Sequence, residues 1–128
     1  MPATAKGKEL LDKMMKARGF VWPAFELLCE MDPELIEHYE GMKNYVLGKK
    51  QEMPEHLREM FISVAIAVRH PAATDGLKEH IKRALKLGAT PRQMLEAFES
   101  IFPPCGMTVL IAGCGALKEA MEELGLKP

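Results

Sequence analysis

Residues 80–97 of the sequence read HIKRALKLGATPRQMLEA, and this stretch carries the clearest structural signals in the chain. An apolar helical period ends before Gly88, a residue common after a helix end. Thr90 then precedes Gln93 by three residues, with a proline between them, which is the pattern of a capping box at a helix start. The stretch therefore predicts the end of one helix near residue 87 and the start of another at Thr90.

The rest of the chain has the same organisation, with helical apolar periods separated by turn residues and no alternating strand. We expect an all-α helical bundle of about six to seven helices. The last helix is apolar nearly all round from Met107 to Ala116, so it needs cover on every side. In so short a chain that cover is expected from another subunit, which predicts a homo-oligomer. The expected helices span about 4–18, 23–31, 32–48, 54–69, 74–87, 90–103 and 106–124.

The composition excludes several classes of protein. Of the 128 residues, 48% are hydrophobic and 27% are charged, as in an ordinary globular domain. Basic and acidic residues are interleaved and the formal net charge is −1, so no nucleic acid partner is expected. The apolar runs are too short or too broken for a membrane span, and residues 1–7 do not resemble a signal peptide. We expect one cytoplasmic domain over 1–128, with a single core and no membrane contact.

The predicted helix from Pro54 has two faces that both look buried. A carboxylate, Glu59, lies on one of them, where it is costly unless it is paired or hydrogen bonded. Poor solvation favours the protonated form of a carboxylate, which adapts it to act as a general base near neutral pH. Glu59 is therefore a candidate catalytic residue. One face contains Leu57, Phe61, Val64 and Val68, and the other contains Glu59, Ile62, Ser63, Ile66 and His70.

His80 is the second candidate, because it lies on the flank of the apolar stripe of the next helix. Imidazole changes charge near neutral pH and can pass a proton. Each residue also has a purely structural interpretation: a histidine at a core edge, and a surface glutamate paired with Arg58 or a lysine. The coincidence of Glu59 and His80 favours an enzyme site.

The order of these residues resembles a known family. The pattern HxxxALxxGAT at 80–90, followed by a helix containing LEA and preceded by Leu57-Arg58-Glu59, closely resembles the carboxymuconolactone decarboxylase and AhpD-like proteins. The resemblance covers 54–124 as a family core. Residues 1–50 match only in being helical and form an N-terminal extension. The resemblance implies an all-α protein without cofactors that assembles as a trimer or hexamer.

In the redox branch of that family, a glutamate precedes a C-x-x-C-x-x-x-H motif. Aligned on His80, the two cysteine positions are Ala73 and Gly76, and the loop at 69–75 is two residues longer than the pattern. Disulfide chemistry needs a thiolate and a resolving partner. The resemblance therefore implies that thiol peroxidase activity is absent, and that Glu59 and His80 keep a proton-handling relationship without a cysteine nucleophile.

The decarboxylase branch acts on small acidic lactones of aromatic catabolism, also lacks the cysteine pair and keeps the histidine. Its acidic residue four positions before the histidine falls on Gly76 here. Decarboxylation leaves a carbanion or dienolate, so it requires a proton donor and cations that hold the carboxylates. The resemblance implies a cofactor-free lyase that uses Glu59 and His80 on a small acidic metabolite. The positive charge is expected from Arg58, Arg69 or His70.

Three alternatives stay open. Cys105 follows two prolines at an expected helix start, where the helix dipole favours a thiolate, so a peroxidase-like protein could use it, although a small buried hydrophobe is the simpler interpretation. His70, His80 and Glu59 could bind a metal, but no histidine pair has the i, i+4 spacing of helical metal motifs, so none is expected. The last alternative is a non-catalytic oligomeric module that binds a small ligand.

Overall fold

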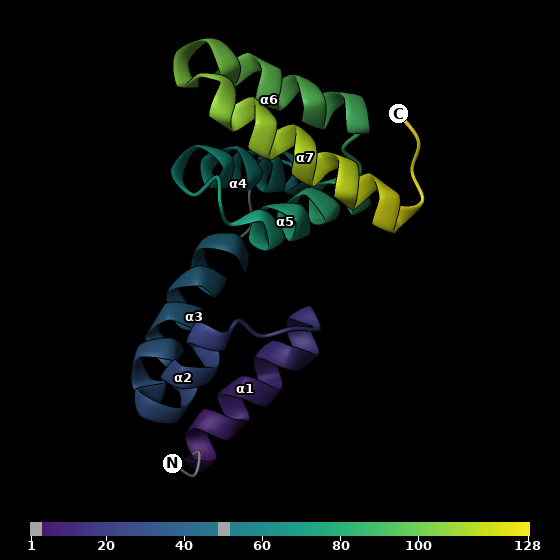
Figure 1. Ribbon diagram of the computed structural model, residues 1–128. Helices are drawn as coiled ribbons and strands as arrows, with labels where there is room; N and C mark the ends of the chain where they lie inside the picture. Colours follow the sequence, from purple (N-terminus) through teal and green to yellow (C-terminus); the bar gives the residue numbers. More distant parts are fainter. Residues whose placement is uncertain (1–3, 49–51) are drawn as a thin grey trace. The chain divides into compact units, whose positions relative to one another are not determined.

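The computed structural model describes residues 4–48 and 52–128. These residues form seven α-helices and no strand (Figure 1), which confirms the all-α prediction for the described parts of the chain. The chain divides into two compact units, 1–50 and 51–128. Each unit has its own hydrophobic cluster, where the sequence analysis expected one core. The predicted single domain, with an extension over 1–50 and a family core over 54–124, stays a prediction.

The N-terminal unit consists of α1 (Ala5–Arg18), α2 (Pro23–Met31) and α3 (Pro33–Gly48). The Thr4 hydroxyl accepts a hydrogen bond of 3.0 Å from the N–H of Gly7 and thereby caps α1. Local signals of this kind explain why the helices begin where the sequence predicted. Each helix contributes one side chain to the buried cluster, which consists of Met14, Cys29 and Ile36.

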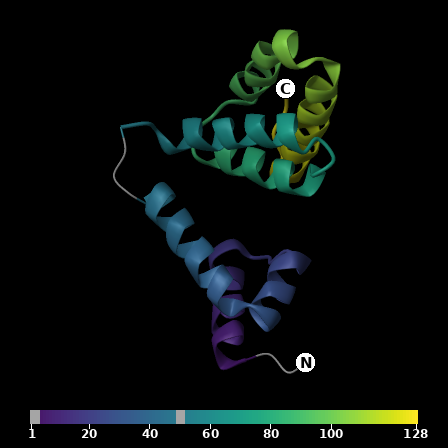
Figure 2. The ribbon, with the colours of Figure 1, turned by 90° about the vertical axis from the view of Figure 1, so that its left-hand side faces the viewer.

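The C-terminal unit consists of α4 (Glu55–Arg69), α5 (Thr74–Lys86), α6 (Pro91–Cys105) and α7 (Met107–Leu124). Helices α4 and α5 lie side by side, as do α6 and α7, and α7 also packs on α5 (Figures 1 and 2). The predicted capping box is confirmed, because Thr90 and Gln93 exchange two hydrogen bonds of 3.0 Å at the start of α6. The fully enclosed side chains are Ser63, Ala67, Leu77, Ile81, Ala84, Met94, Phe98 and Ala120.

The buried stripe of α4 contains Glu59, Ser63 and Ala67, so it overlaps one of the two predicted faces and adds Ala67, which was predicted on neither. His70, predicted on the same face as Glu59, is exposed. The Ser63 hydroxyl donates a hydrogen bond of 2.8 Å to the carbonyl oxygen of Glu59. On the other face, Phe61 is 59% exposed and Val68 is 46% exposed. The apolar period identified both faces, but packing against α5, α6 and α7 covers one of them.

Helix α6 runs through the two prolines that were predicted to stop it and ends at Cys105. The fixed φ of proline is compatible with a helix, so two prolines near the end remove hydrogen bonds without reversing the chain. The N–H of Gly106 donates to the oxygen of Phe102 at 2.8 Å and closes the last turn. Gly106 has a φ of 86°, a conformation that favours glycine, and it separates α6 from α7.

The first half of α7 is covered on one side only. Val109, Gly113 and Ala116 are buried, whereas Met107 and Ile111 are exposed. The expectation that another subunit covers the remaining side stays a prediction. None of the described helices is both long enough and apolar enough to cross a membrane.

Two lysines of α5 connect this helix to the end of α7. The ammonium groups of Lys78 and Lys82 lie 2.8 Å and 2.9 Å from the carboxylate oxygens of Glu123. Their hydrogen bonds lower the pKa of Glu123 from 4.5 to about 2. The α5–α7 pairing is therefore supported by charge at its rim as well as by the apolar core.

Candidate functional site

Glu59 of α4 and His80 of α5 meet inside the C-terminal unit. Oε2 of Glu59 lies 2.7 Å from Nδ1 of His80, which is hydrogen-bond distance. The Glu59 side chain is 11% exposed and that of His80 is 29% exposed, so the carboxylate is largely enclosed while the imidazole reaches the surface. The pair forms within one chain, and Nε2 is the ring nitrogen that does not contact the carboxylate.

The packing of α4 on α5 explains this contact. Glu59 is followed by Ser63 and Ala67 on the buried stripe of α4. His80 precedes Ile81, which is fully buried, and therefore lies on the flank of the buried stripe of α5. When the two helices bury these stripes against each other, the carboxylate and the imidazole are brought together at the edge of the interface.

A third side chain, that of Arg83, joins the pair from α5. Its Nη1 atom lies 3.8 Å from Oε1 of Glu59, the oxygen that does not contact His80. His80 and Arg83 are three residues apart on one helix, so their side chains are neighbours on one face. Arg83 is not among the residues predicted from the sequence. Its i, i+3 spacing from His80 is visible there, but its proximity to Glu59 depends on the packing of α4 on α5.

Two of the three cations predicted to bind substrate lie far from Glu59. Arg69 is the last residue of α4 and His70 follows it, and both are exposed. Arg69 lies ten positions after Glu59 on the same helix, which corresponds to about 15 Å along the axis. Arg58 is the sequence neighbour of Glu59 and is half-buried. Successive residues of a helix point about 100° apart, so adjacency in sequence does not place Arg58 beside the carboxylate group.

Cys105 is exposed, so it is not the buried hydrophobe of the simpler interpretation. It is the last residue of α6, because that helix continues through its prolines, and it directly precedes Gly106, the N-cap residue of α7. Burial raises the pKa of the Cys29 and Cys114 thiols. Ala73 and Gly76, the positions of the redox cysteine pair, lie at the start of α5.

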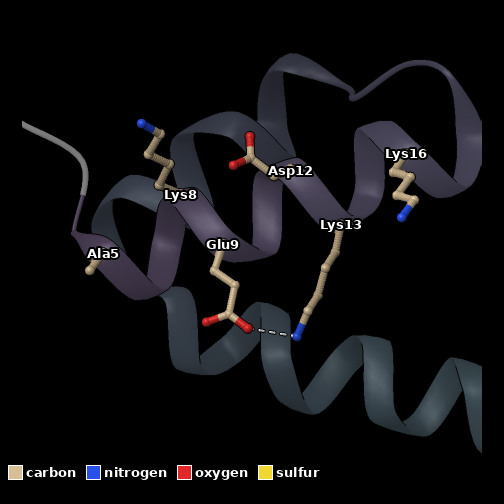
Figure 3. Close-up of a pocket in the computed structure, with 6 residues that line it drawn as sticks. All are labelled: Ala5, Lys8, Glu9, Asp12, Lys13 and Lys16. Atoms are coloured by element: carbon tan, nitrogen blue, oxygen red, sulfur yellow. Dashed lines mark ion pairs between the residues drawn. The ribbon is translucent and has the colours of Figure 1, made fainter.

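Two surface depressions lie apart from these side chains. One lies along α1, and the side chains that line it point to different sides of that helix (Figure 3). The other, of about 460 Å³, lies between the start of α5 and α7 and is lined mainly by small residues with Thr74 and Thr108. Neither is lined by Glu59, His80 or Arg83. In residues 4–48 and 52–128, no three histidine, cysteine or acidic side chains are grouped as metal ligands.

A comparison with protein families supports the resemblance seen in the sequence. The family model for carboxymuconolactone decarboxylase matches residues 33–119, a region that contains Glu59, His80 and Arg83. The match begins at the start of α3, so the family region extends further toward the N-terminus than the predicted core from residue 54. No curated protein and no solved structure matches the chain. Because the family model covers more than half of the sequence, the chain belongs to the carboxymuconolactone decarboxylase family.

Proposed function

We propose that the protein is a cofactor-free, decarboxylase-like lyase that transfers protons on a small carboxylated, lactone-like metabolite. Membership of the family supports this class of reaction. The single observation that carries the proposal is the 2.7 Å contact between Glu59 and His80. A largely enclosed carboxylate that holds a partly exposed imidazole is an arrangement suited to general acid–base catalysis.

In this proposal Glu59 orients His80 and determines its tautomer. An ionised carboxylate accepts a hydrogen bond from Nδ1–H, which leaves the lone pair of the neutral imidazole on Nε2. Nε2 can then accept a proton from a substrate, or donate one when the ring is an imidazolium. Glu59 also stabilises the imidazolium by its negative charge. His80 is the catalytic acid–base residue and Glu59 is the residue that positions it.

The proposed reaction balances without a cofactor. The bond between the ring and the departing carboxylate breaks, CO₂ leaves, and the electron pair moves into the conjugated lactone as a dienolate. The Nε2–H of the His80 imidazolium protonates a carbon of this dienolate. Solvent then returns a proton to the imidazole. In sum, one carboxylate and one proton are converted into CO₂ and a C–H bond.

Release of CO₂ from a carboxymuconolactone by the purified protein tests the proposal. Glu59→Gln and His80→Ala should keep the helical fold and lose about 100-fold to 10,000-fold in rate, the usual contribution of a positioned acid or base. Glu96→Gln and His38→Ala are the matched controls, because both residues are exposed, and both variants should react at the wild-type rate.

Each alternative function has its own signature in the same assays. Full activity of both site variants would contradict the proton-transfer role. Binding of the lactone without turnover by the wild-type protein would support a non-catalytic ligand-binding module. Consumption of peroxide with a dithiol reductant, abolished by Cys105→Ser, would support a peroxidase-like protein that uses the exposed Cys105 thiol.

We also propose that the protein is a homo-oligomer, either a trimer or a hexamer. The support is the exposure of large apolar side chains in the C-terminal unit, where Phe61 is 59% exposed and Ile111 is 68% exposed. Exposed apolar area of this kind is typical of surfaces that are covered in an assembly. Sedimentation that shows a folded monomer at micromolar concentration would contradict the proposal.

A further inference from the structure

Arg83 lies next to His80, and its guanidinium is only partly engaged. Its Nη1 atom is 3.8 Å from Oε1 of Glu59, beyond the roughly 2.7–3.2 Å of an N–H···O hydrogen bond. In the parts of the chain that the structure describes, the guanidinium of Arg83 makes this one ion pair. The side chain is 43% exposed. Arg83 therefore keeps N–H donors that can bind a ligand while its charge remains beside Glu59.

Two other basic side chains of the same helix contact α7, because the ammonium groups of Lys78 and Lys82 are both hydrogen bonded to Glu123. Lys86 is the last residue of α5 and is exposed. Arg83 is the basic residue of α5 that forms an ion pair with Glu59, and its side chain is partly open to solvent. The i, i+3 spacing places its side chain on the same helix face as that of His80, so a ligand in contact with Nε2 of His80 is within reach of the guanidinium.

A guanidinium matches the geometry of a carboxylate, because it can donate two parallel hydrogen bonds to the two oxygens. We propose that Arg83 anchors a carboxylate of the substrate and so determines the specificity of the site for anionic ring compounds. This inference rests on the proposed function of Glu59 and His80. It assigns the anchoring charge to a different residue from Arg58, Arg69 and His70.

The anchored carboxylate is one that the product retains. Negative charge moves off a carboxylate as it departs as CO₂, so an ion pair to the departing group would stabilise the bound substrate more than the transition state. An ion pair to a retained carboxylate stabilises both equally. Loss of such an interaction raises KM and leaves kcat nearly unchanged.

The kinetic experiment compares Arg83→Gln, Arg83→Lys and Arg92→Gln with the wild-type protein on a carboxymuconolactone. Arg83→Gln should raise KM about 10-fold to 100-fold, the usual range for a lost charge-assisted hydrogen bond, with little change in kcat. Arg83→Lys keeps the charge but not the two parallel donors, so its KM should be intermediate. Arg92, which pairs with Glu96 and is 73% exposed, is the matched control, and Arg92→Gln should retain the wild-type KM.

A binding experiment gives a result that does not depend on turnover. Benzoate should shift the NMR signals of the His80 ring in the wild-type protein, and benzamide, which has the same shape without the charge, should not. Arg83→Gln should weaken benzoate binding by the same factor as it raises KM. Circular dichroism checks that the variant retains its helices.

The inference is overturned by an unchanged KM and benzoate affinity in Arg83→Gln, by an equal loss in Arg92→Gln, or by the absence of a benzoate shift in the wild-type protein. The outcome for the proposed function is separate. If Glu59→Gln and His80→Ala retain full turnover while benzoate still binds through Arg83, the anchor is supported and the proton-transfer role is wrong.

Discussion

The N-terminal and C-terminal units are built from similar helices but bury very different numbers of apolar side chains. Among the described residues, three buried side chains form the cluster of the first unit and thirteen form that of the second. In the first unit, Met31 is 63% exposed and Met42 is 62% exposed. Glu59, His80 and Arg83 all lie in the second. A catalytic arrangement must be held to within about 0.5 Å, so it requires the more densely packed support.

The comparison also separates helix formation from packing. Helix-end signals occur in the N-terminal unit as they do in the C-terminal unit. The Thr4 hydroxyl caps the start of α1, and Gly19 adopts a left-handed conformation at its end. Its helices are therefore well specified although few of their side chains are enclosed. Most helical stability in proteins comes from packing of an apolar face, so the two units should differ in stability.

The largest effect is expected from deletion of enclosed side chains. Phe98→Ala should lower the free energy of unfolding of the C-terminal unit by about 3–5 kcal/mol, and Ile36→Ala should lower that of the N-terminal unit by about 2–5 kcal/mol. Because Ile36 is one of the three buried side chains of the hydrophobic cluster there, its loss should remove hydrogen-exchange protection from α1, α2 and α3 while α4 to α7 stay protected. Leu27→Ala, at a site that is 54% exposed, is the control. Equal loss of protection in both units would contradict their separation.

A smaller effect is expected from two glycines of α7 that differ in their surroundings. A Cβ atom on Gly113 would lie 2.5 Å from the Phe98 ring, whereas one on Gly115 would meet nothing within 4 Å. Gly113→Ala should therefore destabilise the C-terminal unit by about 1–3 kcal/mol through overpacking. Gly115→Ala should stabilise it by up to about 1 kcal/mol, because alanine favours a helix. Denaturant midpoints measure both.

The N-terminal unit offers the same test. A Cβ atom on Gly7 would overlap with the carbonyl oxygen of Cys29, whereas one on Gly41 would meet nothing within 4 Å. A backbone oxygen cannot rotate away as a side chain can, so Gly7→Ala should separate α1 from α2, and Gly41→Ala should not. Tolerance of alanine at Gly7 would show that this unit is too loosely packed for the close approach to matter.

The smallest effect concerns acid stability. The pKa of Glu123 is lowered to about 2 by hydrogen bonds from Lys78 and Lys82, so its contribution to stability is fully present above pH 4.5 and is lost as the pH falls toward 2. Glu123→Gln should remove this part of the pH dependence, and added salt should reduce it. Thermal melts between pH 2 and pH 6 measure the change, with Glu96→Gln as the control. An identical acid profile in Glu123→Gln and wild type would contradict the role of the α5–α7 pair. In the N-terminal unit, the hydrogen bond from Lys6 likewise lowers the pKa of Glu37.

The candidate site was predictable where it depends on one helix at a time. The position of Glu59 on an apolar face and of His80 on the flank of another is visible in the sequence, and the structure shows the two side chains in contact. Arg83 was missed because its relation to Glu59 exists only across two packed helices. Arg69 lies at the other end of α4 from Glu59, and its role in substrate binding stays a prediction.

Except for the end of α6, the sequence by itself determined the helices and where they begin and end, because a capping hydroxyl, a proline at a first position or a glycine at a last one acts on neighbouring backbone groups. Tertiary structure decided which apolar face of α4 is covered, where the prolines leave Cys105, and which cation lies beside the carboxylate. The physical reason is that periodicity marks a face as apolar without identifying its partner, and side chains on different helices come within a few ångströms only when those helices pack.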